Sequence, residues 1–333
     1  MMKVLMVALL LFINTSIFAE ILPSTHFKSV QSFISQMVKD HNFNRPELQF
    51  IFSKVHLKKI SKDNQKPATP SKASEKTSWQ TYQSLFITKE RIDNGVTFWN
   101  NNQQTLLNAE KKYGVPSEII VAILGIETNY GKVQGKYPTL KTLIGKAFGT
   151  SSRRDFYRNE LESFLLLARE NMLPPLAIKG SSAGALGYAQ FIPSSYRHYA
   201  VDFDNDFKVD LFNNTHDAIG SIANYLARHY WQHSGAIAEP IGLKDNHQFF
   251  AQSSISKPSK NAQYWRKQGV EINHDINDNT KLALIRLGGG QSVQTWLTFW
   301  NFYAITRYNH DNRYAMTVYQ LSKQLKQAFT STI

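Results

Sequence analysis

GVPSEIIVAILGIETNYG, residues 114–131, predicts a helix at the centre of the protein. Its first four residues form a turn and cap signal, and Glu118 would lie in the first helical turn. The run from residue 119 to 126 is apolar on nearly all sides, which is typical of a helix surrounded by other elements. We expect this helix to end near Gly131.

Glu127 ends the apolar run, where a charged carboxylate is costly to bury unless it is paired or protonated. Apolar surroundings and the negative end of the helix dipole both favour the neutral acid, so its pKa should be raised. A glutamic acid that keeps its proton near neutral pH can donate it to a glycosidic oxygen. From position alone, a structural glutamate bonded to backbone amides of the next turn is an equal alternative.

Helical periodicity recurs on both sides of this stretch, so we expect a mainly α fold of the α+β type. Polar residues with several lysines and two prolines predict a long exposed loop at 61–78. Short apolar alternations predict a small β-containing insert at 236–284. The expected helices cover about residues 26–40, 86–108, 154–171, 215–232 and 311–329.

The chain has 333 residues, 42% hydrophobic and 19% charged, which is the composition of an ordinary globular protein. Its length predicts one large domain or a few smaller lobes. The net charge of +13 indicates an anionic partner, and nucleic acid, anionic lipid and acidic cell-wall polymer all satisfy that condition. Aromatic residues make up 13% of the chain, and they either fill cores or face bound sugars.

The N-terminus has the three parts of a secretory signal. Lys3 precedes an apolar run at residues 4–13, and the small residue Ala19 stands before Glu20. The run is short for a membrane span, so we expect cleavage after Ala19, with a retained N-terminal anchor as the alternative. The chain has no cysteine, which excludes disulfides and the lipidated cysteine of a lipoprotein. We therefore expect a soluble exported protein with no membrane span after cleavage.

Short polar and aromatic motifs recur in three parts of the chain. They are ETNYG at 127–131, GYAQFIPS at 187–194 with DAIGSIANY at 217–225 after it, and RYN at 307–309 with YAM at 314–316. In this order they resemble the motifs of lysozyme-like lytic transglycosylases. Over about residues 79–330 the sequence is similar to the lytic murein transglycosylase B family, and it resembles a non-lipidated member.

The resemblance implies a lysozyme-like catalytic core with a flanking α-helical lobe and a small β-containing insert. We divide the chain accordingly into a signal peptide at 1–19, an N-terminal helical segment and exposed loop at 20–78, an α lobe and catalytic core at 79–235, the insert at 236–284, and a C-terminal part completing the core at 285–333.

In this family a single glutamate protonates the leaving oxygen of the β-1,4 bond between N-acetylmuramic acid and N-acetylglucosamine. It then takes the proton of the C6 hydroxyl, which attacks C1 and forms a 1,6-anhydro ring. The resemblance assigns both roles to Glu127. No second carboxylate stands beside Glu127 in the motifs, whereas a two-carboxylate glycosidase needs one at a defined separation. The implied partners are the glycan strands of periplasmic peptidoglycan, with cell-wall synthesis proteins as a further option whose members the sequence does not identify.

Polar positions of the substrate site also follow from the resemblance. Ser181 and Gln190 would hydrogen-bond the sugar or the catalytic carboxylate. Arg153 and Arg154 would meet the peptide carboxylates of murein, because a guanidinium fork suits a carboxylate. The alternative for the arginine pair is a solvated helix start.

Aromatic positions of the site are implied in the same way. Asn309, Tyr308 and Tyr314 would line the cleft from the far end of the chain. Tyr82 and Tyr225 would supply surfaces that face the sugars. Core packing remains the alternative for each tyrosine.

Residues 202–210, DFDNDFKVD, open like an EF-hand calcium loop, and relatives in this group have such a loop. Phe207 stands where the sharp turn usually has glycine, which weakens the match. A calcium or sodium ion and an acidic solvated turn both remain open, and no other cofactor is expected. The ligands would be Asp202, Asp204, Asp206, the backbone carbonyl of Lys208, and Asn213 at the closing position.

A soluble periplasmic lytic transglycosylase is therefore the leading hypothesis. A hydrolytic muramidase on the same scaffold, leaving reducing ends, is the second. A non-catalytic peptidoglycan-binding scaffold is the third, and an intact Glu127 argues against it. A nucleic-acid binder is disfavoured by the signal segment and by the absence of a nucleic-acid motif.

Overall fold

The computed structural model describes residues 24–55, 78–241, 255, 257–288 and 293–331. The signal predicted at 1–19 and nearly all of the loop predicted at 61–78 lie outside these residues. The described chain is mainly helical and contains two small antiparallel sheets, which confirms the predicted fold class. None of its helices combines the length and the apolar character that crossing a membrane requires.

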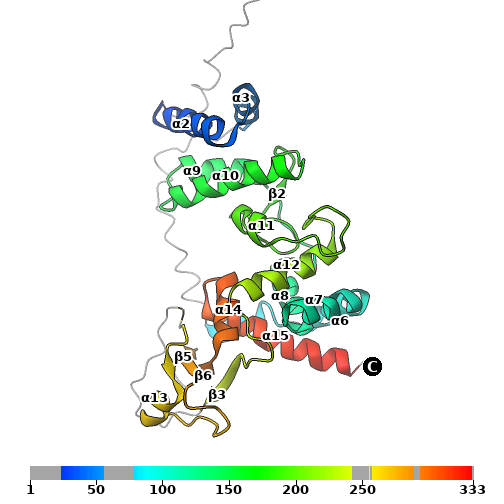
Figure 1. Ribbon diagram of the computed structural model, residues 1–333, viewed down its shortest axis with the longest axis vertical. Helices are drawn as coiled ribbons and strands as arrows, with labels where there is room; N and C mark the ends of the chain where they lie inside the picture. Colours follow the sequence, from blue (N-terminus) through cyan, green and yellow to red (C-terminus); the bar gives the residue numbers. More distant parts are fainter. Residues whose placement is uncertain (1–23, 56–77, 242–254, 256, 289–292, 332–333) are drawn as a thin grey trace, which may run out of the picture.

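The elements stack along the long axis of the molecule (Figure 1). The helices α2 and α3 lie at one end and the sheet with β3, β5 and β6 lies at the other. The elements are α2 (Ser24–His41), α3 (Arg45–Ser53), α5 (Trp79–Ser84), α6 (Lys89–Asn101), α7 (Gln103–Tyr113), α8 (Ser117–Thr128), β1 (Tyr137–Pro138), α9 (Thr139–Phe148), α10 (Arg154–Glu170), β2 (Lys179–Gly180), α11 (Pro193–Tyr199), α12 (Thr215–Arg228), β3 (Ala238–Ile241), β4 (Lys260–Asn261), α13 (Ala262–Lys267), β5 (Lys281–Leu287), β6 (Gln294–Thr298), α14 (Trp300–Tyr308) and α15 (Asn312–Thr330).

The helices expected from periodicity are present as α2, α8, α10, α12 and α15. The helix expected at 86–108 is divided into α6 and α7 at Asn102. The side-chain amide of Asn102 donates to the carbonyl of Phe98 at 2.8 Å, and its own backbone leaves the helical region. Asparagine favours such breaks because its side chain competes for backbone hydrogen bonds.

Helix α8 is the centre of the fold, with α6, α7, α12 and α15 packed around it. Its residues 119–124 are all buried, as the apolar run predicts, and each isoleucine or leucine contributes about 1.5–3 kcal/mol by leaving water. The helix ends because Asn129 and Tyr130 take left-handed backbone conformations, with φ of 48° and 60°. Glu127 is therefore one residue from the C-terminal end of α8.

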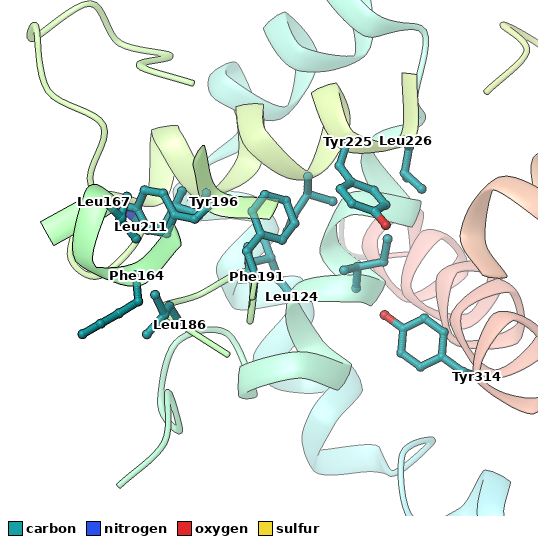
Figure 2. Close-up of a cluster of buried hydrophobic side chains, with 14 of the residues drawn as sticks. Leu124, Phe164, Leu167, Leu186, Phe191, Tyr196, Leu211, Tyr225, Leu226 and Tyr314 are labelled. Atoms are coloured by element: carbon teal, nitrogen blue, oxygen red, sulfur yellow. The ribbon is translucent and has the colours of Figure 1, made fainter. Parts of the chain in front are cut away.

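The core around the end of α8 draws side chains from distant parts of the sequence. Figure 2 shows Leu124 of α8 beside Phe191, and Tyr225 of α12 and Tyr314 of α15 belong to the same cluster of buried side chains. The rings of Phe191 and Tyr225 are 5.4 Å apart. This packing fixes the end of α8 against α12 and α15.

The four-stranded sheet has the order β3-β6-β5-β4, and all its pairings are antiparallel. It has a small core of its own, which includes Val270, Leu282 and Leu297. β5 and β6 continue to Leu287 and Thr298, so the sheet extends past the insert boundary expected at residue 284.

Candidate active site

A cleft of about 870 Å³ opens beside the C-terminal end of α8. Its walls come from α8, the start of α10, the loop between β2 and α11, α11, α12 and the end of α14. Seven of the predicted site residues line this one cavity, namely Glu127, Arg153, Ser181, Gln190, Tyr225, Tyr308 and Asn309.

Glu127 is partly exposed to the cleft and receives a hydrogen bond from Tyr314. The Tyr314 hydroxyl donates to its Oε1 at 2.6 Å. Burial raises the pKa of Glu127 to about 7, and the hydrogen bond from Tyr314 acts in the opposite direction. A carboxyl with this pKa is present in both its protonated and its ionised form at neutral pH, so it can donate a proton and also accept one.

Tyr314 does not line the cleft, because it is only 2% exposed and lies between α15 and α8. Its contact with Glu127 depends on the packing of α15 along α8. The ring of Tyr308 is nearly parallel to that of Tyr314, at 6.4 Å and 11°. The Tyr308 hydroxyl donates to the carbonyl of Ala189 at 2.6 Å. This hydrogen bond joins the RYN segment near the C-terminus to the GYAQFIPS segment.

Thr128 and Gly131 join the first two motifs. The Thr128 hydroxyl lies 3.1 Å from the carbonyl of Tyr188 and accepts from the N–H of Gly131 at 2.9 Å. Gly131 has φ of +87°, and a Cβ there would lie 1.9 Å from the Tyr188 ring. Only glycine fits this position.

Gln190 and Ser181 are held by backbone groups at the cleft wall. The Gln190 amide nitrogen donates to the carbonyls of Gln134 and Gly187 at 3.1 and 3.0 Å. The Ser181 hydroxyl accepts from the N–H of Ala185 at 3.0 Å. The Gln190 amide oxygen is therefore left to accept a hydrogen bond, and the Ser181 hydroxyl to donate one.

An aromatic wall surrounds Tyr225 of α12. Its ring stacks on His229 at 4.0 Å and contacts Tyr199 and Tyr308 at 4.8 and 4.9 Å. Its hydroxyl donates to the carbonyl of Arg307 at 2.6 Å. Tyr225 is 7% exposed, so its ring is part of the core as well as of the cleft wall.

The two predicted arginines stand at the start of α10, and only one of them lines the cleft. Arg153 lines the cleft, and its guanidinium lies 4.0 Å from the ring of Phe156. Arg154 is exposed and does not line the cavity.

Tyr82 also lies outside the cavity, under the guanidinium of Arg313 at 4.8 Å. Burial and the charges of Asp311 and Glu127 raise the pKa of Tyr82 to about 12, while Arg313 lowers it. Tyr82 is therefore close enough to Glu127 to sense its charge.

Several cleft residues were not expected from the sequence, including His198, His229, Arg307 and His310. Glu160 was also missed. It is buried behind the cleft and accepts from the N–H and the hydroxyl of Ser194 at 2.9 and 2.8 Å. Its place on the inner face of the amphipathic helix α10 was the available signal.

Among the described residues that line the cleft, Glu127 is the only carboxylate. The buried Glu160 does not line it and is occupied by Ser194. The cavity therefore offers one acid to a ligand, surrounded by aromatic rings, hydroxyls, amides and cationic groups.

The acidic loop brings together two of the predicted ligands and one unexpected residue. Asp202, Asp204 and Asp217 place carboxylate oxygens within 4.8 Å of one another. The buried Asp217 carboxylate accepts from the N–H groups of Phe203 and Asp210 at 2.8 and 2.7 Å. Three hard oxygen donors at this spacing suit calcium.

The other predicted ligands of this loop have different partners. The Asp206 carboxylate accepts from the N–H of Lys208 at 2.9 Å, and the Asn213 amide donates to Asp210 at 3.2 Å. Phe207 takes φ of 69° and is 98% exposed, so the sharp turn forms without glycine.

A helical core whose aromatic cleft is lined, among the described residues, by one partly exposed acid is the arrangement of a lysozyme-like, glycan-cleaving class of enzyme. Residues 26–323 match the model of the transglycosylase SLT domain, and the chain belongs to this family. The family membership that the motifs indicated is confirmed.

One relative is itself named as a lytic transglycosylase. The membrane-bound lytic murein transglycosylase B of Escherichia coli is 40% identical over 305 residues, which cover 89% of this chain and 82% of the relative. The chain thus belongs to the lytic transglycosylases, the enzyme class that the motifs indicated.

Solved structures confirm the fold. The Escherichia coli lytic transglycosylase Slt35 in complex with calcium has a TM-score of 0.80 and 37% identity, covering 90% of this chain and 93% of that one. Soluble lytic transglycosylase SltB1 of Pseudomonas aeruginosa has a TM-score of 0.78 and 36% identity, covering 90% and 99%. A complex of Slt35 with bulgecin A has a TM-score of 0.79 and 38% identity, covering 90% and 93%.

Proposed function

We propose that the protein cleaves the β-1,4 bond between N-acetylmuramic acid and N-acetylglucosamine without water and leaves a 1,6-anhydro end. Glu127 is the catalytic acid and then the base. The observation that carries this proposal is a carboxyl with a pKa of about 7 in a cleft that no other described carboxylate lines. A hydrolase with two carboxylates would need a second one facing the bond.

The proton balance of the reaction needs only this carboxyl. Protonated Glu127 gives its proton to the glycosidic oxygen as the bond to C1 breaks. The resulting carboxylate takes the proton of the C6 hydroxyl, whose oxygen bonds to C1 and closes the ring. Because the Tyr314 hydroxyl occupies Oε1, we assign the transferable proton to Oε2. Tyr314 also stabilises the carboxylate between the two steps.

The cleft walls supply the remaining contacts. We propose that the Ser181 hydroxyl and the Gln190 amide oxygen hydrogen-bond the sugars, together with the exposed Asn309 at the end of α14. Tyr225 and Tyr308 give the sugars an apolar wall. Arg153 binds carboxylates of the peptide stems from the cleft edge.

Tyr82 and Arg154 lie outside the cavity, so a sugar bound in the cavity does not account for either residue. We propose that Tyr82 acts on the Glu127 side of the cleft through its neighbour Arg313. Arg154 would reach only a stem peptide that extends over the start of α10.

We also propose a structural calcium ion in the acidic loop, held by Asp202, Asp204 and Asp217. The calcium complex of Slt35 supports this proposal. Bound there, the ion would offset most of the negative charge of the three carboxylates and tie the loop to the start of α12. It would stabilise the fold and take no part in the proton transfers.

The proposed substrate implies where the protein works and which proteins it meets. We propose that the protein works in the periplasm, where murein lies, after removal of residues 1–19, and that cell-wall synthesis proteins are its partners. We keep the division at 20–78, 79–235, 236–284 and 285–333 as a proposal, in which β5 and β6 join the insert to the C-terminal part.

Digestion of purified peptidoglycan tests the reaction. Mass spectrometry of the released fragments should show anhydro-muramyl ends. Fragments heavier by one water would indicate a hydrolytic muramidase. No release would indicate a non-catalytic scaffold.

A further inference from the structure

An aromatic row lies on the outer side of α14. Trp300, Tyr303 and Arg307 recur at a spacing of three or four residues, so they share one face of the helix. All three are partly exposed, whereas residues 301, 302 and 304–306 are buried. The described core therefore does not need this face for its own packing.

The side chains of this row contact one another in succession. Tyr230, which follows α12, has its ring 6.1 Å from that of Trp300. The Trp300 ring lies 5.7 Å from the Tyr303 ring, and the Arg307 guanidinium lies 5.4 Å from the Tyr303 ring. Tyr230 is 67% exposed. The row is thus continuous from Tyr230 to Arg307.

The row begins at the catalytic cleft. Arg307 lines the cleft together with Tyr308 and His310, and its guanidinium contacts the His310 ring. A polymer that fills the cleft and leaves it past Arg307 therefore meets Tyr303 and then Trp300. Most of the row lies outside the cavity, so the cleft contacts do not account for it.

Cationic groups stand at both ends of the row. The Lys257 ammonium lies 5.5 Å from the Trp300 ring, and Arg307 lies at the cleft end. In the described part of the chain, no carboxylate forms an ion pair with Lys257 or Arg307. Cations beside exposed rings, without a carboxylate partner among the described residues, suit a ligand with apolar faces and carboxylates.

We propose that Tyr230, Trp300, Tyr303 and Arg307 form a secondary glycan-binding track that holds the peptidoglycan strand where it continues beyond the cleft. The aliphatic faces of the sugar rings cover the aromatic rings, and the carboxylates of the peptide stems approach Lys257 and Arg307. The inference rests on the proposed function, because it takes the substrate of the cleft as its ligand.

Two substrates distinguish binding at the track from binding in the cleft. We would compare wild type with Trp300→Ala and Tyr230→Asn on insoluble peptidoglycan and on a short soluble muropeptide that fills only the cleft. Each ring removed should weaken cosedimentation with insoluble peptidoglycan roughly two- to tenfold and raise KM in proportion. Cleavage of the short fragment should stay at the wild-type rate. Tyr230→Asn keeps a residue that tolerates the left-handed backbone at that position, with φ of 71°.

Phe50→Ala is the matched control. Phe50 is 57% exposed and, like Trp300, has a lysine ammonium over its ring, here at 4.8 Å, but it lies on α3 at an end of the molecule far from α14 (Figure 1). Unchanged binding of both track variants, or an equal loss in Phe50→Ala, would overturn the track. An equal loss of cleavage on the short fragment would also overturn it. Wild type that cleaves neither substrate would refute the proposed function itself.

Discussion

Replacing Tyr314 by phenylalanine removes the hydrogen bond that the Tyr314 hydroxyl donates to the Glu127 carboxyl, and leaves the aromatic ring in place. The bond is 2.6 Å long and lowers the pKa of Glu127 against the effect of burial. A hydrogen bond to a charged group contributes about 1.5–3 kcal/mol. One pKa unit corresponds to about 1.4 kcal/mol, so the pKa of Glu127 should rise by roughly one to two units.

The assay is the pH dependence of kcat/KM on purified peptidoglycan, which reports the ionisations of the free enzyme. In wild type the rate should fall above about pH 7, since Glu127 then loses the proton that it donates. In Tyr314→Phe this alkaline limb should move upward by about one to two pH units. The rate on the plateau should also fall, because the carboxylate formed in the first step has lost its donor.

Tyr308→Phe is the control for this shift. Tyr308 is parallel to Tyr314, but its hydroxyl donates to the carbonyl of Ala189 and not to Glu127. Its removal should lower stability and leave the alkaline limb where it is in wild type. The reasoning on Glu127 is refuted if Tyr314→Phe keeps the wild-type limb, or if both variants shift it equally.

Three further predictions follow from the site. The pKa of Glu127 is raised from 4.5 to about 7, so wild type should lose up to about 3 kcal/mol of unfolding free energy as pH rises through this range. Glu127→Gln should not show this loss. Urea unfolding of both proteins at about pH 4 and pH 8 checks this, and an equal pH dependence of the two unfolding free energies would contradict it. Calcium should raise the Tm of wild type and have little effect on Asp217→Asn, whereas equal shifts in both would remove the acidic loop as the binding site. Arg153→Met should raise KM for peptide-bearing glycan several-fold and leave peptide-free glycan unaffected, while Arg154→Met, outside the cavity, should have a smaller effect on the peptide-bearing glycan. Equal effects of the two variants would show that the cleft position of Arg153 is irrelevant.

Local sequence patterns were sufficient to predict helix α8, which carries Glu127 of the ETNYG motif. The apolar run before Glu127 predicted a central helix, and α8 is surrounded by four other helices. The raised pKa of Glu127 was expected from apolar surroundings and the helix dipole, and burial is its largest cause in the structure.

Contacts between distant segments could not be predicted from patterns. The hydrogen bond from Tyr314 to Glu127 joins positions 187 residues apart, and it exists only because α15 packs on α8. Asp217 reaches Asp202 and Asp204 through the packing of α12 against the acidic loop, whereas the spacing of the loop pointed to Asn213. The row on α14 was missed because no helix was expected at residues 300–308.

The most direct test of the central claim is the release of fragments from peptidoglycan by Glu127→Gln at pH 7. The amide keeps the size of the side chain and cannot act as an acid or a base. Release should fall roughly a hundred- to ten-thousand-fold, while cosedimentation with peptidoglycan stays at the wild-type level. Glu110→Gln is the control, because this carboxylate holds the other end of α8, where it accepts from the Ser117 hydroxyl at 2.8 Å. Normal turnover by Glu127→Gln would contradict the assignment of Glu127 as the catalytic acid and base.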